Sequence, residues 1–363
     1  MLLLAIVLAL LSIIIDLSAL ILLRFPETGN VAESTLPNVS ILVPMFNEES
    51  NVDALIKNLQ MLDYPAGNFE ILIGEDRSTD KTPEKLRVAA SQDVRIKVVT
   101  IEKDIPGLLG KANVIAQLIP HSTTEFYFIT DADVRVPSAW VKTVLANYHS
   151  KVGVIGGITV VPVSSLWSGL QNIDWLLAQG LIHVAGQVFQ TVAVSGTNMM
   201  VSRDACATIG GYANIPYPLT EDIGLLTAVK NMGFTGKNLI HAGCTAVTNP
   251  CPGVGSLLQQ RSRWIYGVLK LPWYIIALLI IRASFLLLVA LILLWQPITG
   301  FILLGLKMGI DLLLVRRIAR RVRADFTVWH FLFFEVYWFS MSMCGLFMHL
   351  FSVNTNWKGR DYQ

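Results

Sequence analysis

Residues 126–133 read Phe-Tyr-Phe-Ile-Thr-Asp-Ala-Asp, a strongly apolar β-type run that ends directly in two aspartates. Three earlier runs have the same form, and each also ends at a loop rich in polar residues: 39–43, 69–73 and 96–99. Between the first two runs, apolar residues recur at helical spacing and predict a helix with one buried stripe. Strands that alternate with helices predict βαβ units, so we expect an α/β fold with a mainly parallel sheet.

Polar residues gather where these strands end, and ligands of such sheets bind at the strand carboxyl ends. The residues at those ends are Asn47, Glu48, Asp76, Asp131 and Asp133. The last two have the spacing to hold a divalent cation against the diphosphate of a nucleotide, and oxygen ligands suit Mg²⁺ or Mn²⁺. Such an ion would stabilise the departing diphosphate. The alternative is a solvated aspartate pair in a turn, and the pair taken alone favours that alternative.

A second acidic motif, Thr220-Glu221-Asp222, lies in a polar stretch before an apolar helix. Asp222 can serve as a general base, whereas Thr220 can simply cap the helix. Sugar transfer with inversion needs a carboxylate opposite the leaving group to take the proton of the acceptor hydroxyl. A cation-binding pair and a separate base together make a complete mechanism, so the two motifs indicate more together than either does alone.

A third motif, Gln260-Arg-Ser-Arg-Trp264, lies within residues 257–270, which mix apolar and basic side chains. This mixture predicts an interfacial amphipathic helix that anchors the protein at a membrane surface. A second role is compatible with the first: Arg263 would steady the diphosphate while Gln260 and Trp264 line the acceptor pocket.

Long apolar segments flank the region of strands. Hydrophobic residues make up 53% of the chain and charged residues 15%, against roughly 45–50% and about 25% in soluble domains. Residues 2–23 are long enough to cross a bilayer and lack the basic start and cleavage site of a signal peptide, so we interpret them as an anchor. Further apolar stretches lie near 272–295, 298–315 and 327–352.

Five arginines between residues 316 and 323 predict that this loop is cytoplasmic, and Arg24 predicts the same for the segment after the first helix. The soluble domain would then be cytoplasmic, in a multi-pass protein of the plasma (inner) membrane. Charged residues are rare in membrane spans, and we expect Arg282, Lys307 and Asp311 to lie near span ends or to face protein.

With these motifs in this order, the chain resembles membrane-integrated members of glycosyltransferase family 2, including ceramide glucosyltransferase-like and polysaccharide synthase-like members. The resemblance covers nearly the whole chain and implies a GT-A catalytic domain. The matching segments are 43–49, 75–80, 110–113, 131–133, 195–198, 210–212, 220–222 and 260–264.

For the donor, the resemblance implies that Pro44, Glu48 and Asp76 contact the nucleoside and that Lys111 lies near the sugar nucleotide. The family usually has two aspartates where this chain has Glu75-Asp76, and a glycine where it has Arg77. We expect the longer side chain of Glu75 and the positive charge of Arg77 to affect which donor is preferred. A uridine diphosphate sugar is the expected donor.

For the chemistry, the resemblance implies that Asp131 and Asp133 serve the ribose, the diphosphate and the metal. Asp222 would be the base, and Glu221 and Arg263 complete the predicted catalytic set.

The expected organisation has five parts: an anchor at 1–24, a GT-A domain at 36–250, an interfacial helix at 254–270, about three transmembrane helices at 271–353 and a basic tail at 354–363. The tail segment Trp357-Lys-Gly-Arg360 resembles that of members that glycosylate lipids, and a basic juxtamembrane tail is the alternative. A single crossing by residues 327–352 would place this tail on the side away from the donor.

The predicted function is transfer of one sugar to a lipid or lipid-linked acceptor, with membrane lipids as further partners and no nucleic acid. A processive β-polysaccharide synthase shares every catalytic motif but usually has more spans. A noncatalytic scaffold or transporter that binds nucleotide sugars is the alternative from another class. His241 is interpreted as a core histidine rather than a further metal ligand.

Overall fold

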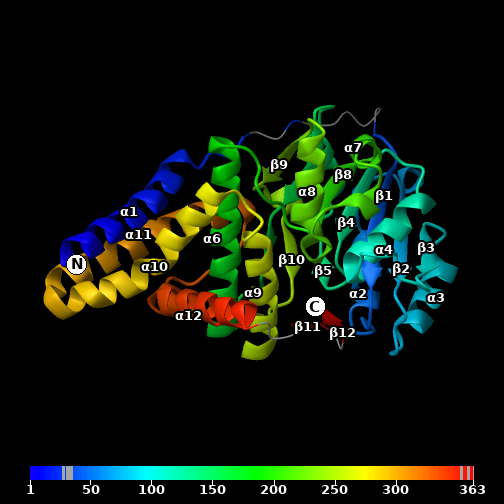
Figure 1. Ribbon diagram of the computed structural model, residues 1–363. Coiled ribbons are helices and arrows are strands. Elements are labelled where there is room, and N and C mark those ends of the chain that lie inside the picture. The colour runs from blue at the N-terminus through cyan, green and yellow to red at the C-terminus, as the bar shows by residue number, and fades with distance from the viewer. Residues whose placement is uncertain (27–28, 30–35, 352–354, 358–359, 363) are drawn as a thin grey trace.

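The computed structural model describes residues 1–26, 29, 36–351, 355–357 and 360–362. An α/β domain occupies one end of the molecule, and a group of long helices extends from it (Figure 1). The strands are β1 Val39–Met45, β2 Phe69–Glu75, β3 Ile96–Thr100, β4 Phe126–Thr130, β5 Val134–Arg135, β6 Val152–Gly157, β7 Thr159–Val160, β8 Asn198–Ser202, β9 Thr235–Leu239, β10 Ala246–Thr248, β11 Thr355–Trp357 and β12 Arg360–Tyr362. The helices are α1 Leu2–Leu22, α2 Val52–Gln60, α3 Thr82–Gln92, α4 Gly110–Leu118, α5 Trp140–Leu145, α6 Leu166–Val188, α7 Arg203–Thr208, α8 Glu221–Asn231, α9 Val254–Val268, α10 Trp273–Trp295, α11 Pro297–Val322 and α12 Phe331–Leu350.

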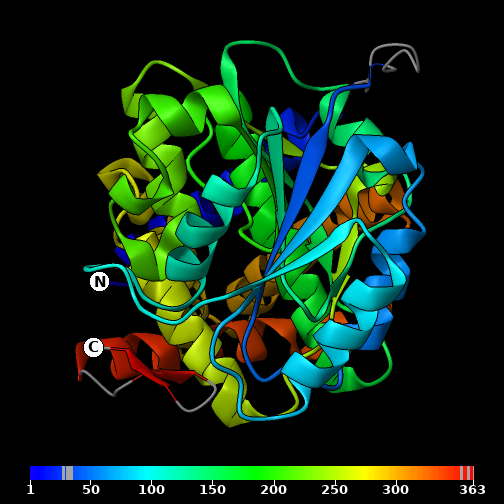
Figure 2. The same ribbon diagram turned by 90° about the vertical axis from the view of Figure 1, so that its right-hand side faces the viewer.

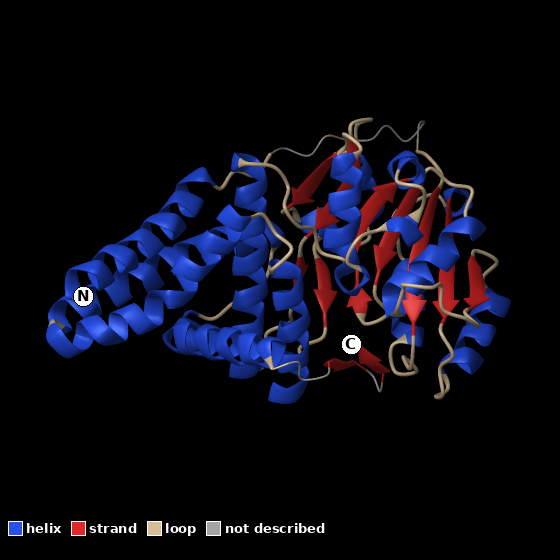
Figure 3. Ribbon diagram, in the orientation of Figure 1, coloured by secondary structure: helices blue, strands red, loops and turns tan. Residues whose placement is uncertain are grey.

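The main sheet has the strand order β3-β2-β1-β4-β8-β6-β9 (Figure 3). Strands β1 to β4 run parallel to one another, and β8 runs antiparallel to both of its neighbours. All four predicted strands are present, and the expected mainly parallel α/β fold is confirmed. The chain reverses its direction across the sheet between β1 and β4, and ligands of open α/β sheets bind at such a reversal.

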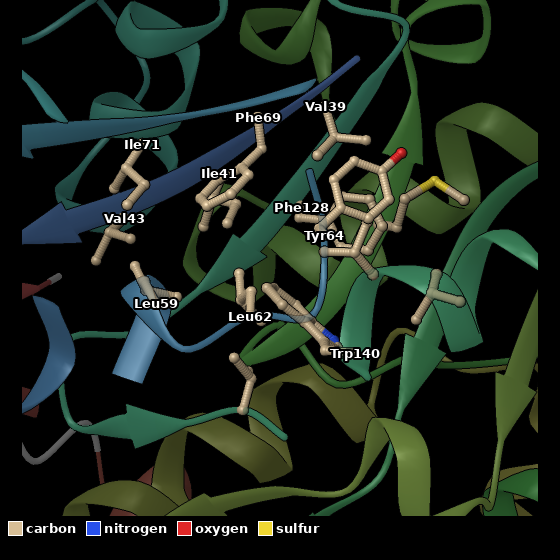
Figure 4. Close-up of a cluster of buried hydrophobic side chains, with 14 of the residues drawn as sticks. Val39, Ile41, Val43, Leu59, Leu62, Tyr64, Phe69, Ile71, Phe128 and Trp140 are labelled. Carbon is tan, nitrogen blue, oxygen red and sulfur yellow. The ribbon is translucent and has the colours of Figure 1, made fainter. Parts of the chain in front are cut away.

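The sheet is covered by helices on both faces, which explains why its strands are continuously apolar. Along β1, Val39 and Ile41 pack with Leu59 of α2 and Trp140 of α5 on one face (Figure 4). Leu42 points to the opposite face and packs in a second cluster with residues of α4 and α8. Side chains on both faces of β1 are therefore buried against helices.

Among the described residues, four helical segments are long and apolar enough to cross a membrane: 2–22, 273–295, 297–322 and 328–350. Helices α1, α10 and α11 pack side by side, and their buried charged side chains are paired in the interior. Arg282 Nε donates to Asp16 Oδ1 at 3.0 Å, and Lys307 Nζ donates to Asp311 Oδ2 at 2.6 Å. As expected, these charged residues face protein.

The C-terminal strands β11 and β12 form a two-stranded antiparallel sheet, and β11 contacts α9. Lys358 and Gly359 of the predicted tail motif lie outside the described residues. The backbone of β11 nevertheless places this part of the tail beside the α/β domain (Figure 1).

Candidate active site

The two aspartates after β4 point toward different partners. Asp131 Oδ1 lies 2.7 Å from Lys111 Nζ, whereas Asp133 Oδ2 accepts a hydrogen bond of 3.2 Å from Thr248 Oγ1 on β10. The short strand β5 begins at the next residue, Val134, and pairs with β10. The motif is therefore held between the main sheet and the small β5-β10-β7 sheet, and its two carboxylates have different partners.

The second acidic pair begins α8, at the other side of the same site. Asp222 accepts two backbone hydrogen bonds, from Gly196 N to Oδ2 at 3.0 Å and from Ile223 N to Oδ1 at 2.8 Å. Burial, followed by the charge of Glu221, raises the pKa of Asp222 to about 7, against the effect of these hydrogen bonds and of Lys111. A carboxylate with such a pKa suits a general base near neutral pH.

Lys111, at the start of α4, joins the two acidic motifs. Its ammonium lies 2.7 Å from Asp131 and 3.3 Å from Glu221, and it donates to the carbonyl of Gly196 at 2.8 Å. Burial opposes the charged form, but the nearby carboxylates outweigh it and raise the pKa of Lys111 above its usual value. The lysine therefore stays cationic and partly neutralises the acidic cluster.

Gly196 has a role that its motif, Ser195-Gly-Thr-Asn198, did not reveal. A Cβ atom at this position would lie 2.9 Å from Oε1 of Glu221 and 3.2 Å from Oδ2 of Asp222. Only glycine lets the backbone approach both carboxylates, so that its N–H and its carbonyl bind the predicted base and Lys111 respectively. Asn198 of the same motif is structural, since it is fully buried and bonds the carbonyls of Ile158 and Cys244.

The predicted nucleoside contacts lie at the carboxyl ends of β1 and β2. Pro44 lies opposite Gly74 in the β1–β2 pairing, and the N–H of Asp76 donates to the carbonyl of Met45 at 2.9 Å. The Glu48 carboxylate accepts a bond of 2.7 Å from Asn51 Nδ2. Pro44, Glu48 and Asp76 thus lie at the carboxyl ends of two adjacent strands, β1 and β2.

Arg77, which stands where the family usually has glycine, has a φ angle of 59°. This left-handed conformation is one that glycine adopts without strain. The arginine forms ion pairs with Asp76 at 2.9 Å and with Asp104 at 2.7 Å. The departure from the family pattern therefore adds a cation beside the expected nucleoside contact.

Helix α9 carries the third motif and is held by a buried ion pair that sequence reasoning missed. Arg261 pairs with Asp174 of α6, and its guanidinium lies 4.1 Å above the Trp264 ring. Trp264 also meets Trp175 edge to face, with 5.2 Å between ring centroids. The local signal for this pairing was that Asp174 is the only acidic residue of α6.

The surroundings of Thr220 and His241 bear on the alternative roles of these two residues. Thr220 immediately precedes α8, but its side chain makes no capping hydrogen bond, and its buried hydroxyl has no partner among the described residues. His241 accepts a hydrogen bond from the N–H of Gly243 at 3.0 Å, as a structurally satisfied histidine does.

A cavity of about 1350 Å³ connects the acidic cluster to the long helices. At one end it is lined by Lys111, Asp131, Glu221, Asp222, Arg263 and Trp264. Its other end is apolar, with lining from α1, α6 and α10 that includes Ile14, Leu181, Leu278 and Leu279. Pro44, Glu48, Asp76, Asp133 and Gln260 are absent from the described lining. The structure thus brings Asp131, Asp222 and Arg263 to one cavity with an apolar end, whereas Asp133, Gln260 and the residues predicted to contact the nucleoside are not part of its lining.

The carboxylates of Asp131 and Asp133 suit a divalent cation. Among the described residues no three His, Cys, Asp or Glu side chains are grouped to hold a metal. Mg²⁺ in nucleotide sites takes only one or two protein carboxylates and fills its shell with phosphate and water oxygens, so two aspartates are enough. The Thr248 hydroxyl on Asp133 would orient one of the ligands.

Comparison with known families gives a match along almost the entire chain. The model described as Glycosyl transferase family 21 matches residues 4–363. A Beta-monoglucosyldiacylglycerol synthase from Nostoc sp. is 37% identical over 240 residues, which are 65% of this chain and 50% of the relative. Ceramide glucosyltransferase 3 from Caenorhabditis elegans is 21% identical over 240 residues, or 64% of this chain and 51% of the relative. The chain spans about half the length of these curated relatives.

Among solved structures, the mannosyltransferase PcManGT from Pyrobaculum calidifontis, in complex with GDP-Man and Mn²⁺, has a TM-score of 0.61 and 17% identity. The alignment covers 96% of this chain and 99% of that one. This likeness confirms the expected GT-A fold. The expected resemblance to membrane glycosyltransferases of the ceramide glucosyltransferase type is likewise confirmed, with family 21 as the matching model.

Proposed function

The chain belongs to glycosyl transferase family 21, and we propose that it transfers one sugar with inversion from a nucleotide diphosphate sugar to the hydroxyl group of a membrane lipid. The observation that carries the proposal is the cavity, because it joins a carboxylate of raised pKa to an apolar passage between α1, α6 and α10. A polysaccharide acceptor would gain little from a passage lined by leucine and isoleucine. A lipid can place its chains there and its hydroxyl at Asp222.

We base the proposed acceptor and sugar on the names of the relatives. The name of the relative from Nostoc sp. specifies diacylglycerol and a β-linked glucose. The name of the relative from Caenorhabditis elegans specifies ceramide. Both acceptors are neutral lipids with a free hydroxyl and two hydrocarbon chains. We therefore assign a lipid of this class as acceptor and uridine diphosphate glucose as the first donor to test. Guanosine diphosphate mannose, which the structural neighbour binds, is the competing donor.

In the proposed reaction, the acceptor oxygen attacks the anomeric carbon on the face opposite the diphosphate. The new carbon–oxygen bond forms as the bond to the β-phosphate oxygen breaks, and the hydroxyl proton passes to Asp222. Gly196 N–H and Ile223 N–H fix the carboxylate that receives it. Arg263, which lines the cavity, would balance charge that develops on the leaving diphosphate.

Asp131 and Asp133 would hold the divalent cation, which supplies positive charge at the departing diphosphate. Mn²⁺ in the structural neighbour supports this assignment. Lys111 holds Asp131 in place and would limit repulsion between the acidic cluster and the incoming diphosphate. We also propose that the α/β domain is cytoplasmic, and the basic residues at the end of α11 support this orientation.

The test is transfer of labelled sugar in vesicles that contain the purified protein and either diacylglycerol or ceramide. Uridine diphosphate glucose and guanosine diphosphate mannose are supplied in parallel, and products are identified by mass spectrometry. A monoglycosylated lipid is expected; a long water-insoluble polymer without glycolipid would refute single transfer.

Asp222→Asn should retain donor binding, measured by isothermal titration, and lose at least about a hundredfold in turnover. Asp53→Asn is the matched control, because Asp53 is exposed on α2 and pairs only with Lys85 among the described residues. If the Asp222→Asn protein were active, Asp222 would not be the base.

A further inference from the structure

The end of α11 carries a cluster of arginines that the structure places on the helix rather than in a loop. The cluster occupies the last two turns and the residue after them: Arg316, Arg317, Arg320, Arg321 and Arg323. Residues four apart lie on the same face of a helix, so the cluster divides into two rows. Arg317 and Arg321 form one row, and the other three arginines form the second.

The first row holds the end of α1. Arg317 Nη1 donates to the carbonyl of Leu20 at 2.9 Å, and Arg321 Nη2 donates to the carbonyl of Pro26 at 3.4 Å. Both guanidinium groups also lie 5.7 Å from the centre of the Phe25 ring. These contacts join the ends of α1 and α11 to each other.

The joint lies where two membrane helices reach the α/β domain. Asp16 of α1 pairs with Lys307 of α11 at 2.8 Å. Leu20, one turn further along α1, meets Arg317, so the two helices run in the same direction and end together beside that domain (Figure 1). Since α1 also lines the cavity between residues 14 and 22, the end of α11 helps to hold one wall of the passage.

The second row is exposed and has no counter-charge. Arg316, Arg320 and Arg323 are exposed, and so is Arg24, which follows α1. Among the described residues, none of these four side chains forms an ion pair with a carboxylate or donates a hydrogen bond. Together they form an arginine surface around the ends of α1 and α11, and its unbalanced charge attracts anions.

The anions within reach at this level are lipid headgroups, because α1 and α11 leave the hydrocarbon here. Guanidinium groups bind phosphate through two parallel hydrogen bonds. Phosphatidylcholine carries a cation that cancels the charge of its phosphate, whereas phosphatidylglycerol has a net negative charge. Basic residues next to a membrane span are attracted to such anionic lipids.

We propose that the arginine surface is a docking surface for anionic phospholipids in the leaflet next to the α/β domain. Bound headgroups reduce the repulsion between the two rows of arginines, so that the first row keeps its contacts with α1. Because α1 is a wall of the acceptor passage, sugar transfer then depends on anionic lipid. This dependence rests on the proposed function, whereas lipid docking does not.

The first test measures lipid selectivity without turnover. The protein is placed in nanodiscs with equal amounts of phosphatidylcholine and phosphatidylglycerol, and the lipids that stay bound on release are counted by native mass spectrometry. We expect the wild type to retain phosphatidylglycerol about fivefold over phosphatidylcholine, which corresponds to about 1 kcal/mol. The variant with Arg316→Gln, Arg320→Gln and Arg323→Gln should show no preference. Equal retention by the wild type, or a preference that persists in the variant, would overturn the docking surface.

The matched control removes the same charge elsewhere, through Lys57→Gln, Lys81→Gln and Arg87→Gln. These exposed residues belong to the region of α2 and α3, which lies toward the viewer in Figure 2 and away from the long helices in Figure 1. This control should keep the lipid preference; its loss there would mean that net charge alone is responsible. A measurement on the wild type needs no variant, because salt at about 1 M shortens the Debye length to about 3 Å and should abolish the preference.

The second test compares initial rates of sugar transfer in vesicles of phosphatidylcholine alone and in vesicles that also contain phosphatidylglycerol. The rate should rise severalfold with phosphatidylglycerol for the wild type and the control variant, but not for the arginine variant. A lipid preference with an unchanged rate would refute the dependence of transfer on anionic lipid. If no lipid is glycosylated in any vesicle, the proposed function fails, while the retained lipids still decide whether the docking surface exists.

Discussion

Replacing Glu221 by glutamine tests the electrostatics of the proposed base. Both carboxylates lie against Gly196, at 2.9 Å and 3.2 Å from the position of a Cβ atom there, so their nearest oxygens are at most about 6 Å apart. Two unit charges at roughly 6 Å interact by about 1.5–3 kcal/mol for an effective dielectric of about 20–40. Removal of the Glu221 charge should therefore lower the pKa of Asp222 from about 7 by about one to two units.

The sign of the effect on activity follows from the role of a base. Asp222 must be ionised to accept the proton, so kcat/KM falls about tenfold per pH unit below its pKa. In the wild type this acidic limb lies near pH 7, and in Glu221→Gln it moves to lower pH. Lys111 loses one of its two carboxylate partners in this variant, which further favours the ionised form of Asp222.

The assay is the initial rate of lipid glycosylation at limiting acceptor, measured at several pH values with saturating donor and divalent cation. Glu84→Gln is the matched control, because Glu84 is exposed on α3, away from the cavity. An acidic limb that stays in place, or moves to higher pH, in Glu221→Gln would refute the assignment of that limb to Asp222.

Three further variants test the surroundings of the site. Asp174→Asn removes the buried anion paired with α9, so we expect the acceptor KM to rise about tenfold through Trp264 while the donor KM stays unchanged; equal changes in both would argue against a positioning role. Lys307→Met leaves buried carboxylates of α1 and α11 short of a cation, which costs about 3–5 kcal/mol, and the thermal midpoint in detergent should fall while exposed Arg320→Gln leaves it unchanged. Arg77→Gly relieves the left-handed backbone and should raise stability by about 1 kcal/mol in denaturant unfolding; a loss would show that the ion pairs of this arginine outweigh the strain.

Local pattern was sufficient for strands β1 to β4, for a helix at residues 254–268 and for the long apolar helices of the described residues. Each of these features depends on side chains a few residues apart, whose relative directions are set by helical or strand geometry. The motif residues Asp131, Asp133 and Asp222 could be nominated for the same reason, since each follows or begins an element that the pattern identifies.

The sequence could not reveal which of these residues share a cavity. Lys111 meets the carbonyl of Gly196, 85 residues later in the chain, and Arg261 meets Asp174, 87 residues earlier. The raised pKa of Asp222 likewise comes first from burial, which no local pattern specifies. Such contacts arise only when the sheet and helices pack.

In the membrane region, too, some features follow from the sequence and others depend on packing. Length and hydropathy identified residues 327–352 as one more apolar segment, and a simple crossing then put the tail on the wrong side for a donor site. In the structure, α12 packs against α9 and Glu335 lies 3.6 Å from Lys307, so contacts with distant parts of the chain set its direction relative to the other long helices. The sequence by itself determined which segments are apolar enough for lipid and which residues can do chemistry. Only the tertiary structure decided how those segments are oriented and which side chains meet, because both depend on contacts between elements far apart in the chain.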